Sequence, residues 1–487
     1  MGILIVVNNP DTWKLRVPGV EVVAARDYLT DPRFSEMRQT TVFNLCRSYG
    51  YQRLGYYVSL LAAARGQRAT PSIETIQDMR SQVLTRFTSN ELNELVQRTL
   101  KSIRTDEFVL SIYFGKPLAA KHEKLAQALF SAFPVPLLRA RFAREEEGSW
   151  DLQHVGPIPA SEVPESHQEF LHEAAEAYFK KAHFTPRRSK PARYYLAILH
   201  DPEDPSPPSN PQALKRFVQA ANSLDCQADL VTRDDLGRIG EYDALLIRTT
   251  TSVDHFTYRF ARRAEAEGMP VVDDPSSILR CSNKVFLAEM LQRHDIPAPR
   301  TLVIHKKNRQ LVAETLGLPC ILKEPDSAFS RGVVKVGDST ELERELDRLL
   351  DKSELVIGQE FVRTDFDWRI GIFDRKPLWA CRYHMAAEHW QIVSRQGGTT
   401  RYGQVDSIPL DVVPPGVLKI ALRAANLIGD GLYGVDVKAV GKKALVIEVN
   451  DNPNLDGGYE DHCLGLEVYR RIVGGLIERV ERRRAAK

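Results

Sequence analysis

Residues 432–450 read LYGVDVKAVGKKALVIEVN, and this stretch decides how the C-terminal half folds. Two runs of alternating apolar and polar residues flank Gly441-Lys442-Lys443, a pattern that predicts a β-hairpin. With the turn centred on Lys442, Asp436 and Glu448 stand at equal distances from it along the chain. The two carboxylates are therefore expected to lie directly opposite each other.

The hairpin should carry one polar and one packed face, because side chains alternate along a strand. The polar face is predicted to hold Asp436, Lys438, Glu448 and Asn450, and the packed face Tyr433, Val435, Val437, Leu445, Ile447 and Val449. Opposed carboxylates repel, whereas two carboxylates and an amide oxygen suit Mg²⁺. The pattern indicates a magnesium site; a solvated face partly neutralised by Lys438 is the alternative.

Two lysines precede the hairpin in positions that suit phosphate. Lys284 begins a predicted helix, with Ser282 as its expected N-cap. A lysine in the first turn opposes the helix dipole unless an anion also binds there. Lys323 ends a predicted strand. For each lysine taken alone, an ordinary structural position is the alternative.

The loop after Lys323 is rich in small residues, including Ser330 and Gly332. Such a loop lets backbone amides approach phosphate oxygens, although an ordinary hairpin loop has the same composition. The chain lacks the Walker sequence of P-loop enzymes. Further on, Asp367, Arg369 and Arg382 place opposite charges on strand-like segments, for which structural ion pairs are the direct explanation.

The composition excludes several classes of protein. The 487 residues include 66 basic and 64 acidic side chains, a net charge of +2, which predicts neither a nucleic-acid nor a membrane partner. Six scattered cysteines form no Cys-x-x-Cys pair, which argues against zinc and disulfides and favours a cytoplasmic location. No run reaches the roughly 20 apolar residues that span a bilayer.

Three units follow from the sequence pattern. Residues 1–185 are predicted to form an extra α/β domain of unknown role, and a basic, proline-flanked stretch at 185–191 separates it from the rest. Residues 193–283 alternate strands and helices, which predicts a second α/β domain with a parallel sheet. Residues 284–480 mix helices with hairpins, which predicts an α+β fold.

Taken in order, these motifs resemble the ATP-grasp enzymes, and most closely their RimK-like branch. The resemblance covers residues 193–475. It rests on the ordered segments 274–277, 283–284, 296–299, Lys323, 359–362, Asp367-x-Arg369, 434–436 and 448–450. It implies an ATP-grasp fold whose two subdomains clasp ATP. The first 185 residues are similar to the extra domain fused to some RimK-like proteins.

The resemblance also implies roles for single residues. Lys284, Lys323, Ser330 and Gly332 would hold ATP phosphates. Glu360 and Phe361 match the adenine-binding linker, and Asp367 a nucleotide contact. Magnesium, with Mn²⁺ as a substitute, would bind the hairpin residues, and the catalytic arginines would lie near the transferred phosphate or the acceptor. The implied metal ligands are Asp436, Glu448 and Asn450. The implied catalytic arginines are Arg369 and Arg382.

The activity implied is that of a carboxylate–amine ligase. It would use ATP to form an acyl phosphate and add glutamate or a similar amino acid to a peptide, a protein or a small amine. An inactive ATP-binding regulator and a kinase-like enzyme that releases a phosphorylated product are the alternatives. Gln391-Ile392-Val393 replaces a polar run of the family and favours a divergent acceptor pocket. Homo-oligomerisation stays open.

Overall fold

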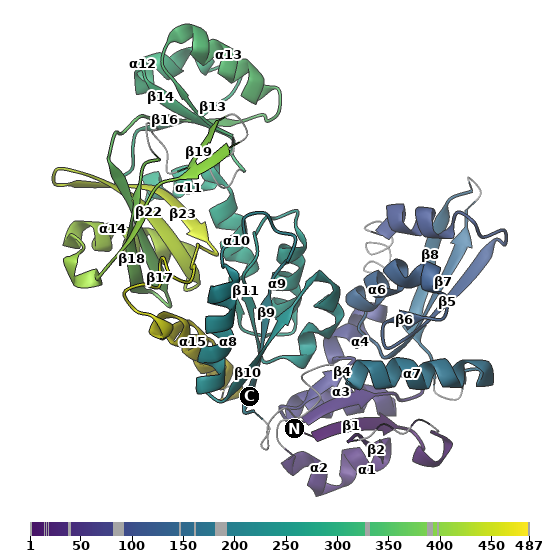
Figure 1. Ribbon diagram of the computed structural model, residues 1–487. Coiled ribbons are helices and arrows are strands. Elements are labelled where there is room, and N and C mark those ends of the chain that lie inside the picture. Colours follow the sequence, from purple (N-terminus) through teal and green to yellow (C-terminus); the bar gives the residue numbers. More distant parts are fainter. Residues whose placement is uncertain are drawn as a thin grey trace.

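The computed structural model describes residues 2–485, apart from 14, 16, 18, 38–39, 81–91, 146–147, 160–161, 181–191, 327–331, 387–392 and 397–398. The chain forms an N-terminal unit, a central unit and a C-terminal unit, with the central unit between the other two (Figure 1). None of the described helices is long and apolar enough to cross a membrane. The boundary stretch expected at 185–191 lies outside the described residues, so the domain limits stay predictions.

The N-terminal unit contains two sheets. A parallel sheet has the order β2-β1-β3-β4, and an antiparallel sheet has the order β6-β5-β7-β8. The strands are β1 Gly2–Val7, β2 Glu21–Ala24, β3 Thr40–Asn44, β4 Arg68–Thr70, β5 Glu107–Tyr113, β6 Lys116–Pro117, β7 Leu137–Arg144 and β8 Trp150–Pro157. The helices are α1 Ala25–Thr30, α2 Pro32–Glu36, α3 Leu54–Ala64, α4 Ile73–Arg80, α6 Glu123–Ala132 and α7 Gln168–Phe179.

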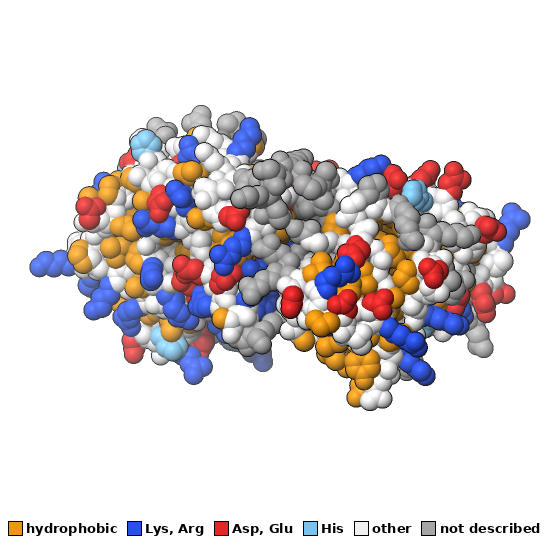
Figure 2. Space-filling model, turned by 90° about the horizontal axis from the view of Figure 1, so that it is seen from below, with side chains coloured by type: hydrophobic (Ala, Val, Ile, Leu, Met, Phe, Trp, Pro, Cys, Tyr) orange, Lys and Arg blue, Asp and Glu red, His pale blue; other side chains and the backbone are white. Residues whose placement is uncertain are grey.

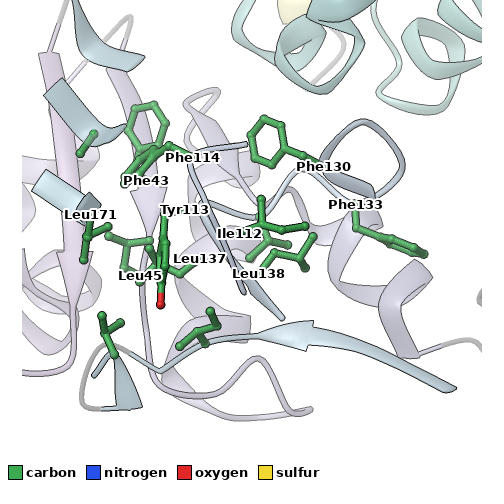
Figure 3. Close-up of a cluster of buried hydrophobic side chains, with 14 of the residues drawn as sticks. Phe43, Leu45, Ile112, Tyr113, Phe114, Phe130, Phe133, Leu137, Leu138 and Leu171 are labelled. Carbon is green, nitrogen blue, oxygen red and sulfur yellow. The ribbon is translucent and has the colours of Figure 1, made fainter. Parts of the chain in front are cut away.

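One hydrophobic core serves both N-terminal sheets. Phe43 of β3 packs edge-on against Phe179 of α7, with ring centroids 4.8 Å apart, and tilted against Phe114 at the end of β5. Figure 3 shows Phe43 of β3 and Leu45, which directly follows β3, close to Tyr113 and Leu137 of the antiparallel sheet. The two sheets and α7 therefore share one continuous hydrophobic core.

The central unit is a parallel sheet of order β10-β9-β11-β12 with helices packed on it. Its first strand is completely buried, as expected for a strand covered on both faces. The elements are β9 Tyr194–Leu199, α8 Pro211–Ser223, β10 Cys226–Val231, η5 Arg233–Glu241, β11 Ala244–Ile247, α9 Phe256–Ala266, β12 Val271–Val272 and α10 Pro275–Ser282.

A buried polar contact joins the N-terminal and central units. Tyr178 of α7 donates a hydrogen bond to Glu241 at the end of η5. The Arg238 guanidinium pairs with the same carboxylate at 3.0 Å and lies over the Tyr178 ring at 4.9 Å. Because Glu241 is almost fully buried, its charge requires both partners, and separating the two units would remove one of them.

The C-terminal unit has two main antiparallel sheets, each in a different part of the unit. The sheet β13-β16-β14-β15 belongs to a small subdomain, and the sheet β21-β18-β17-β22-β23 forms the larger body. The strands are β13 Thr301–Ile304, β14 Cys320–Lys323, β15 Val333–Val336, β16 Val356–Glu360, β17 Phe366–Phe373, β18 Lys376–His384, β21 Val405–Ile408, β22 Leu432–Val440 and β23 Lys443–Asp451.

Helices cover both sheets, and a short separate hairpin lies near the small subdomain (Figure 1). The helices are α11 Lys284–Arg293, α12 Val312–Leu316, α13 Ser339–Leu350, α14 Pro415–Ile428 and α15 Leu466–Ala485, and the hairpin strands are β19 Val393–Gln396 and β20 Thr399–Tyr402. The small subdomain has its own core. Helix α11 instead packs into the core of the larger body.

Buried polar side chains of the central unit fix the open end of the β22–β23 hairpin. Asp273, which follows β12, accepts hydrogen bonds from the backbone N–H groups of Leu432 and Asn452, both at 2.6 Å. Arg248, which follows β11, donates to the Asn452 side chain at 2.8 Å and to the carbonyl of Pro453 at 2.9 Å. The hairpin is therefore anchored to the central sheet immediately beside its polar residues.

Candidate active site

The hairpin register brings the two predicted carboxylates together. Asp436 pairs directly with Glu448 across β22 and β23, which confirms the pairing expected from the sequence. The turn is nevertheless shorter than predicted, since Val440 pairs with Lys443 and Gly441 takes a left-handed φ of 58°. A β-bulge at Ile447 restores the register between the turn and the carboxylates.

The bulge changes which residues face the core. Val446 is fully buried opposite Val437, whereas Leu445 and Ile447 are only partly buried. The prediction that Leu445 and Ile447 lie on the packed face is therefore wrong, because one extra residue reverses the alternation between the turn and Glu448. On the site side of the bulge the predicted alternation is confirmed, with Val435 and Val449 in the core.

Lys284 lies directly at the carboxylates. It is the first residue of α11, its side chain is buried, and its Nζ lies 3.4 Å from Glu448 Oε1. The N-cap is Asn283, which accepts from two backbone N–H groups, and not Ser282 as predicted. Ser282 instead ends α10 and donates to the Ile278 carbonyl, because the chain forms two consecutive helices here rather than one.

Lys323 reaches the same place from the small subdomain. It ends β14, and its Nζ donates to Gln359 Oε1 of β16 at 2.9 Å. Burial lowers the pKa of Lys323 to about 8; the charge of Glu448 opposes this shift and that of Lys284 adds to it. Lys323 therefore occupies a position where further negative charge would be favourable.

Arg369 holds the first carboxylate. On β17, next to β22, its Nε and Nη2 donate to the two oxygens of Asp436 at 2.7 and 2.8 Å, and its guanidinium lies over the Tyr383 ring. Burial raises the pKa of Asp436, and the charge of Arg369 counteracts part of that rise. This two-pronged pair fixes the carboxylate rigidly.

The pKa of Glu448 is shifted in the opposite direction to that of Asp436, because cations surround it. Burial acts to raise its pKa, but the charges of Lys284, Lys323 and Arg369 outweigh burial and lower it. Asn450, two residues on, uses its Nδ2 to donate to Asp436 Oδ2 and to the Gly434 carbonyl, both at 3.4 Å. The amide oxygen of Asn450 is the atom that remains for a metal ion.

Asp367 lies on the same face of the sheet, two residues before Arg369. Its Oδ1 accepts from Lys438 Nζ at 2.6 Å and from Thr364 Oγ1 at 2.9 Å. Lys438 also donates to Thr364 Oγ1. Lys438 was expected on the polar face only as a neutralising charge, and its structural task is to pair with Asp367.

Glu360 ends β16 and Phe361 follows it, at the rim of the small subdomain. The Phe361 ring carries Lys335 Nζ over it at 4.1 Å, and Glu360 Oε2 accepts from Arg300 Nε at 2.6 Å. An aromatic face beside Lys335 and backbone groups is a suitable surface for a planar base. Lys335 was not singled out from the sequence, where it is one polar position in an alternating strand.

Arg382 is not part of this cluster. It lies opposite Trp368 in the β17–β18 register, so its side chain is on the other face of the sheet from Arg369. Its guanidinium lies over the rings of Phe366 and Trp368, at 5.1 and 4.9 Å. The structure therefore separates the two arginines that the sequence analysis grouped together.

The small-residue loop is described only at its ends. Gly332 has a left-handed φ of 65°, and its carbonyl accepts from Glu324 N. The left-handed backbone favours glycine here, and a Cβ would also displace the Glu324 side chain, which lies 2.6 Å from its position. Ser330 and the predicted Gln391-Ile392 pair lie outside the described residues.

The donor set fits a magnesium–nucleotide complex. Hard oxygen donors come from Asp436, Glu448 and Asn450, the kind that Mg²⁺ prefers. Within the described part of the chain no three His, Cys, Asp or Glu side chains form a metal cluster; the third candidate donor beside the two carboxylates is the amide oxygen of Asn450. The carboxylates of the site are Asp367, Asp436 and Glu448, and they are outnumbered by the cations around them, an excess of positive charge that suits a polyphosphate. These cations are Lys284, Lys323, Lys438 and Arg369.

One sheet of the small subdomain and one sheet of the larger body together hold two lysines close to a hairpin with opposed carboxylates. This arrangement is that of an ATP-grasp ligase. Two family models match the chain: the RimK-like ATPgrasp N-terminal domain over residues 25–174 and the RimK-like ATP-grasp domain over residues 281–474. The chain belongs to the RimK-like ATP-grasp family, including the extra N-terminal domain of that family.

Curated relatives bear ligase names. The chain is 25% identical over 255 residues to the "Probable alpha-L-glutamate ligase 2" of Pseudoalteromonas atlantica, covering 50% of this chain and 82% of the relative. It is 26% identical over 197 residues to the "Alpha-aminoadipate--LysW ligase LysX" of Saccharolobus solfataricus, covering 39% of this chain and 68% of the relative.

Among solved structures, a D-alanine–D-alanine ligase from Bacillus anthracis matches with a TM-score of 0.46 at 16% identity, over 60% of this chain and 99% of that one. A RimK domain ATP-grasp protein from Sphaerobacter thermophilus matches with a TM-score of 0.44 at 18% identity, over 58% of this chain and 99% of that one.

Proposed function

We propose that the protein is an ATP-dependent carboxylate–amine ligase that adds glutamate or a similar amino acid to a peptide, a protein or a small amine. The observation that carries this proposal is the opposed pair Asp436 and Glu448 with Lys284 and Lys323 directed at it from two elements. The ligase names of the relatives from Pseudoalteromonas atlantica and Saccharolobus solfataricus support it.

The residues divide the work of phosphoryl transfer. Lys284 and Lys323 would bind phosphate oxygens, and Phe361 the adenine ring. Asp436, Glu448 and Asn450 would hold Mg²⁺, which when bound neutralises charge on the transferring phosphoryl group. Arg369 fixes Asp436 in place for that task and is a positioning residue.

The chemistry proposed has two steps. A substrate carboxylate oxygen attacks the terminal phosphorus of ATP, and ADP leaves. The amine then attacks the acyl carbon, phosphate leaves with the former carboxylate oxygen, and the amine loses a proton as the amide forms. Burial of the site would keep water from the acyl phosphate.

The test is ADP release by the purified chain with Mg-ATP, screened over the amino acids singly and in pairs, with mass analysis of products. Release that depends on glutamate or another amino acid, with a new amide of matching mass, is the expected result. A phosphorylated product without an amide would establish the kinase-like alternative instead. ATP binding without release, across all pairs and peptide acceptors, would favour the regulator.

A further inference from the structure

Helix α3 is apolar on every side, yet one side of it faces solvent. Its eleven residues, LGYYVSLLAAA, include no charged side chain. One side is buried through Gly55, Val58, Ser59 and Ala62. On the other side, Tyr57 and Leu60 are each 37% exposed. Helices that are hydrophobic all round are normally buried, so the exposure of Tyr57 and Leu60 makes this side a candidate binding surface.

Aromatic rings extend the exposed side beyond the helix. Tyr51, in the turn before α3, is 61% exposed. Its ring contacts Tyr56 edge-on at 5.4 Å, and Tyr56 contacts Tyr57 at 5.6 Å. We name this row, Tyr51, Tyr56, Tyr57 and Leu60, the α3 surface. Tyrosine and arginine are enriched among the residues that contribute most to binding at protein interfaces.

The charged residues of the chain segment that carries the α3 surface have one sign, although the helices packed against α3 also carry acidic residues, Asp27 on α1 and Glu74 and Asp78 on α4. Residues 37–73 contain five arginines and neither Asp nor Glu, in a chain whose two signs otherwise nearly balance. Arg65 and Arg68 are occupied by backbone carbonyls and by Asp243. Arg47 and Arg53, at the start of the surface, are exposed. Across the molecule as seen from below, by contrast, acidic and basic side chains are interspersed (Figure 2).

The surface begins at the edge of the sheet where doubly wound folds bind their ligands. In the order β2-β1-β3-β4, the connections after β1 and β3 leave in opposite directions, and this switch point is the usual ligand position. Arg47 follows β3, and its backbone N–H donates to Asn8 Oδ1, which follows β1, at 2.6 Å. The arginine is therefore held at that edge.

We propose that the α3 surface docks an acidic peptide segment that carries apolar side chains. Carboxylates of the segment would pair with Arg47 and Arg53, and its apolar residues would cover Tyr57 and Leu60. A nucleic acid strand fits less well, because it would leave the aliphatic part of the row without a partner. The binding does not depend on ATP or on ligase activity.

The experiment measures fluorescence polarisation of a labelled peptide of about fourteen residues that alternates Glu with Leu and Phe. The full chain is used without nucleotide, and a peptide with Lys in place of Glu is the matched probe. Only the acidic peptide should bind. Arg47→Glu with Arg53→Glu, and separately Tyr57→Ala with Leu60→Ala, should each weaken binding about tenfold or more.

The matched control variants are Arg98→Glu and Leu118→Ala, both exposed residues of the same unit, and they should bind as the parent chain does. Equal binding by all variants, or no binding of the acidic peptide, would overturn the proposal. So would binding of a labelled oligouridylate alone, which would indicate a nucleic acid. Self-association that is lost in Tyr57→Ala with Leu60→Ala would identify a second copy as the occupant.

Discussion

Arg369 and Arg382 lie on adjacent strands of one sheet, and the structure gives them opposite surroundings. Arg369 makes a two-pronged pair with Asp436 among the lysines and carboxylates of the site. Arg382 lies over Phe366 and Trp368, and its buried Nε has no acceptor among the residues that the structure describes. The comparison teaches that a charged residue in a strand acquires its role from the face on which the pleat places it.

The largest effect is expected from removing the carboxylates on the Arg369 face. Asp436→Asn combined with Glu448→Gln should lower ADP release by about a thousandfold or more, because the metal donors lose their charge. Circular dichroism should show an unchanged fold. Asp406→Asn, which alters the face of Arg382, is the matched control, and full activity of the double variant would refute the metal assignment.

Arg369→Met should be the next most damaging change. It leaves Asp436 buried without its cation, which costs about 3 kcal/mol in the free energy of unfolding and should reduce ADP release about a hundredfold. Denaturant unfolding and steady-state turnover are the two measurements. Turnover within about threefold of the parent would show that Asp436 is held by other groups.

A smaller effect is expected from the pH dependence of nucleotide binding. The pKa of Lys323 is lowered to about 8, so the lysine loses its charge above that pH, and affinity for Mg-ATP should fall about tenfold between pH 7 and pH 9. Lys323→Arg, which stays charged, should show no such fall by calorimetry. A fall of equal size in the arginine variant would assign the titration to another group.

The same shift has a stability consequence of defined sign. Between its lowered pKa near 8 and the ordinary value of 10.5, the lysine is neutral in the folded chain but charged in the unfolded chain. Its contribution to stability therefore rises as pH increases through this window. Lys323→Met should remove that part of the rise from a denaturation series.

The smallest effect is expected at Arg382. Arg382→Met leaves a long side chain over the aromatic rings. It removes a charge only from the face of the sheet that lies opposite the candidate active site. ADP release should change by less than about threefold, and the free energy of unfolding by about 1 kcal/mol, the size of a cation–π contact. A loss as large as that of Arg369→Met would show that both faces serve the reaction.

The opposed carboxylates could be predicted from the sequence because alternation and a glycine turn are local signals. The bulge at Ile447 could not, since a bulge leaves no mark in a run of apolar residues. The pairing of Asp436 with Glu448 was still predicted, because the turn error and the missed bulge cancel there. Between the turn and the bulge, Val446 lies in the core, whereas Leu445 had been expected on the packed face.

Contacts between residues far apart in the chain could not be predicted from the sequence either. The face of Arg382 depends on where β17 and β18 pair, and the N-cap at Asn283 depends on a second helix ending just before it. Asp273 and Arg248 gave no sequence signal beyond following short apolar strands. Their role is visible only when segments some 160 to 200 positions away are brought beside them, as the bonds to Leu432 and Asn452 show.

The clamp that Asp273 makes on the two ends of the hairpin determines which parts of the site move together. Through it, Asp436 and Glu448 are tied to the central unit, and Lys284 stays with them because α11 packs into the same core. Lys323 instead belongs to the small subdomain with its separate core. If the small subdomain moved relative to the larger body, Lys323 would move away from the other charged residues of the site, which would stay in place. The distance of Lys323 from Glu448 would then distinguish an open from a closed arrangement of the two parts.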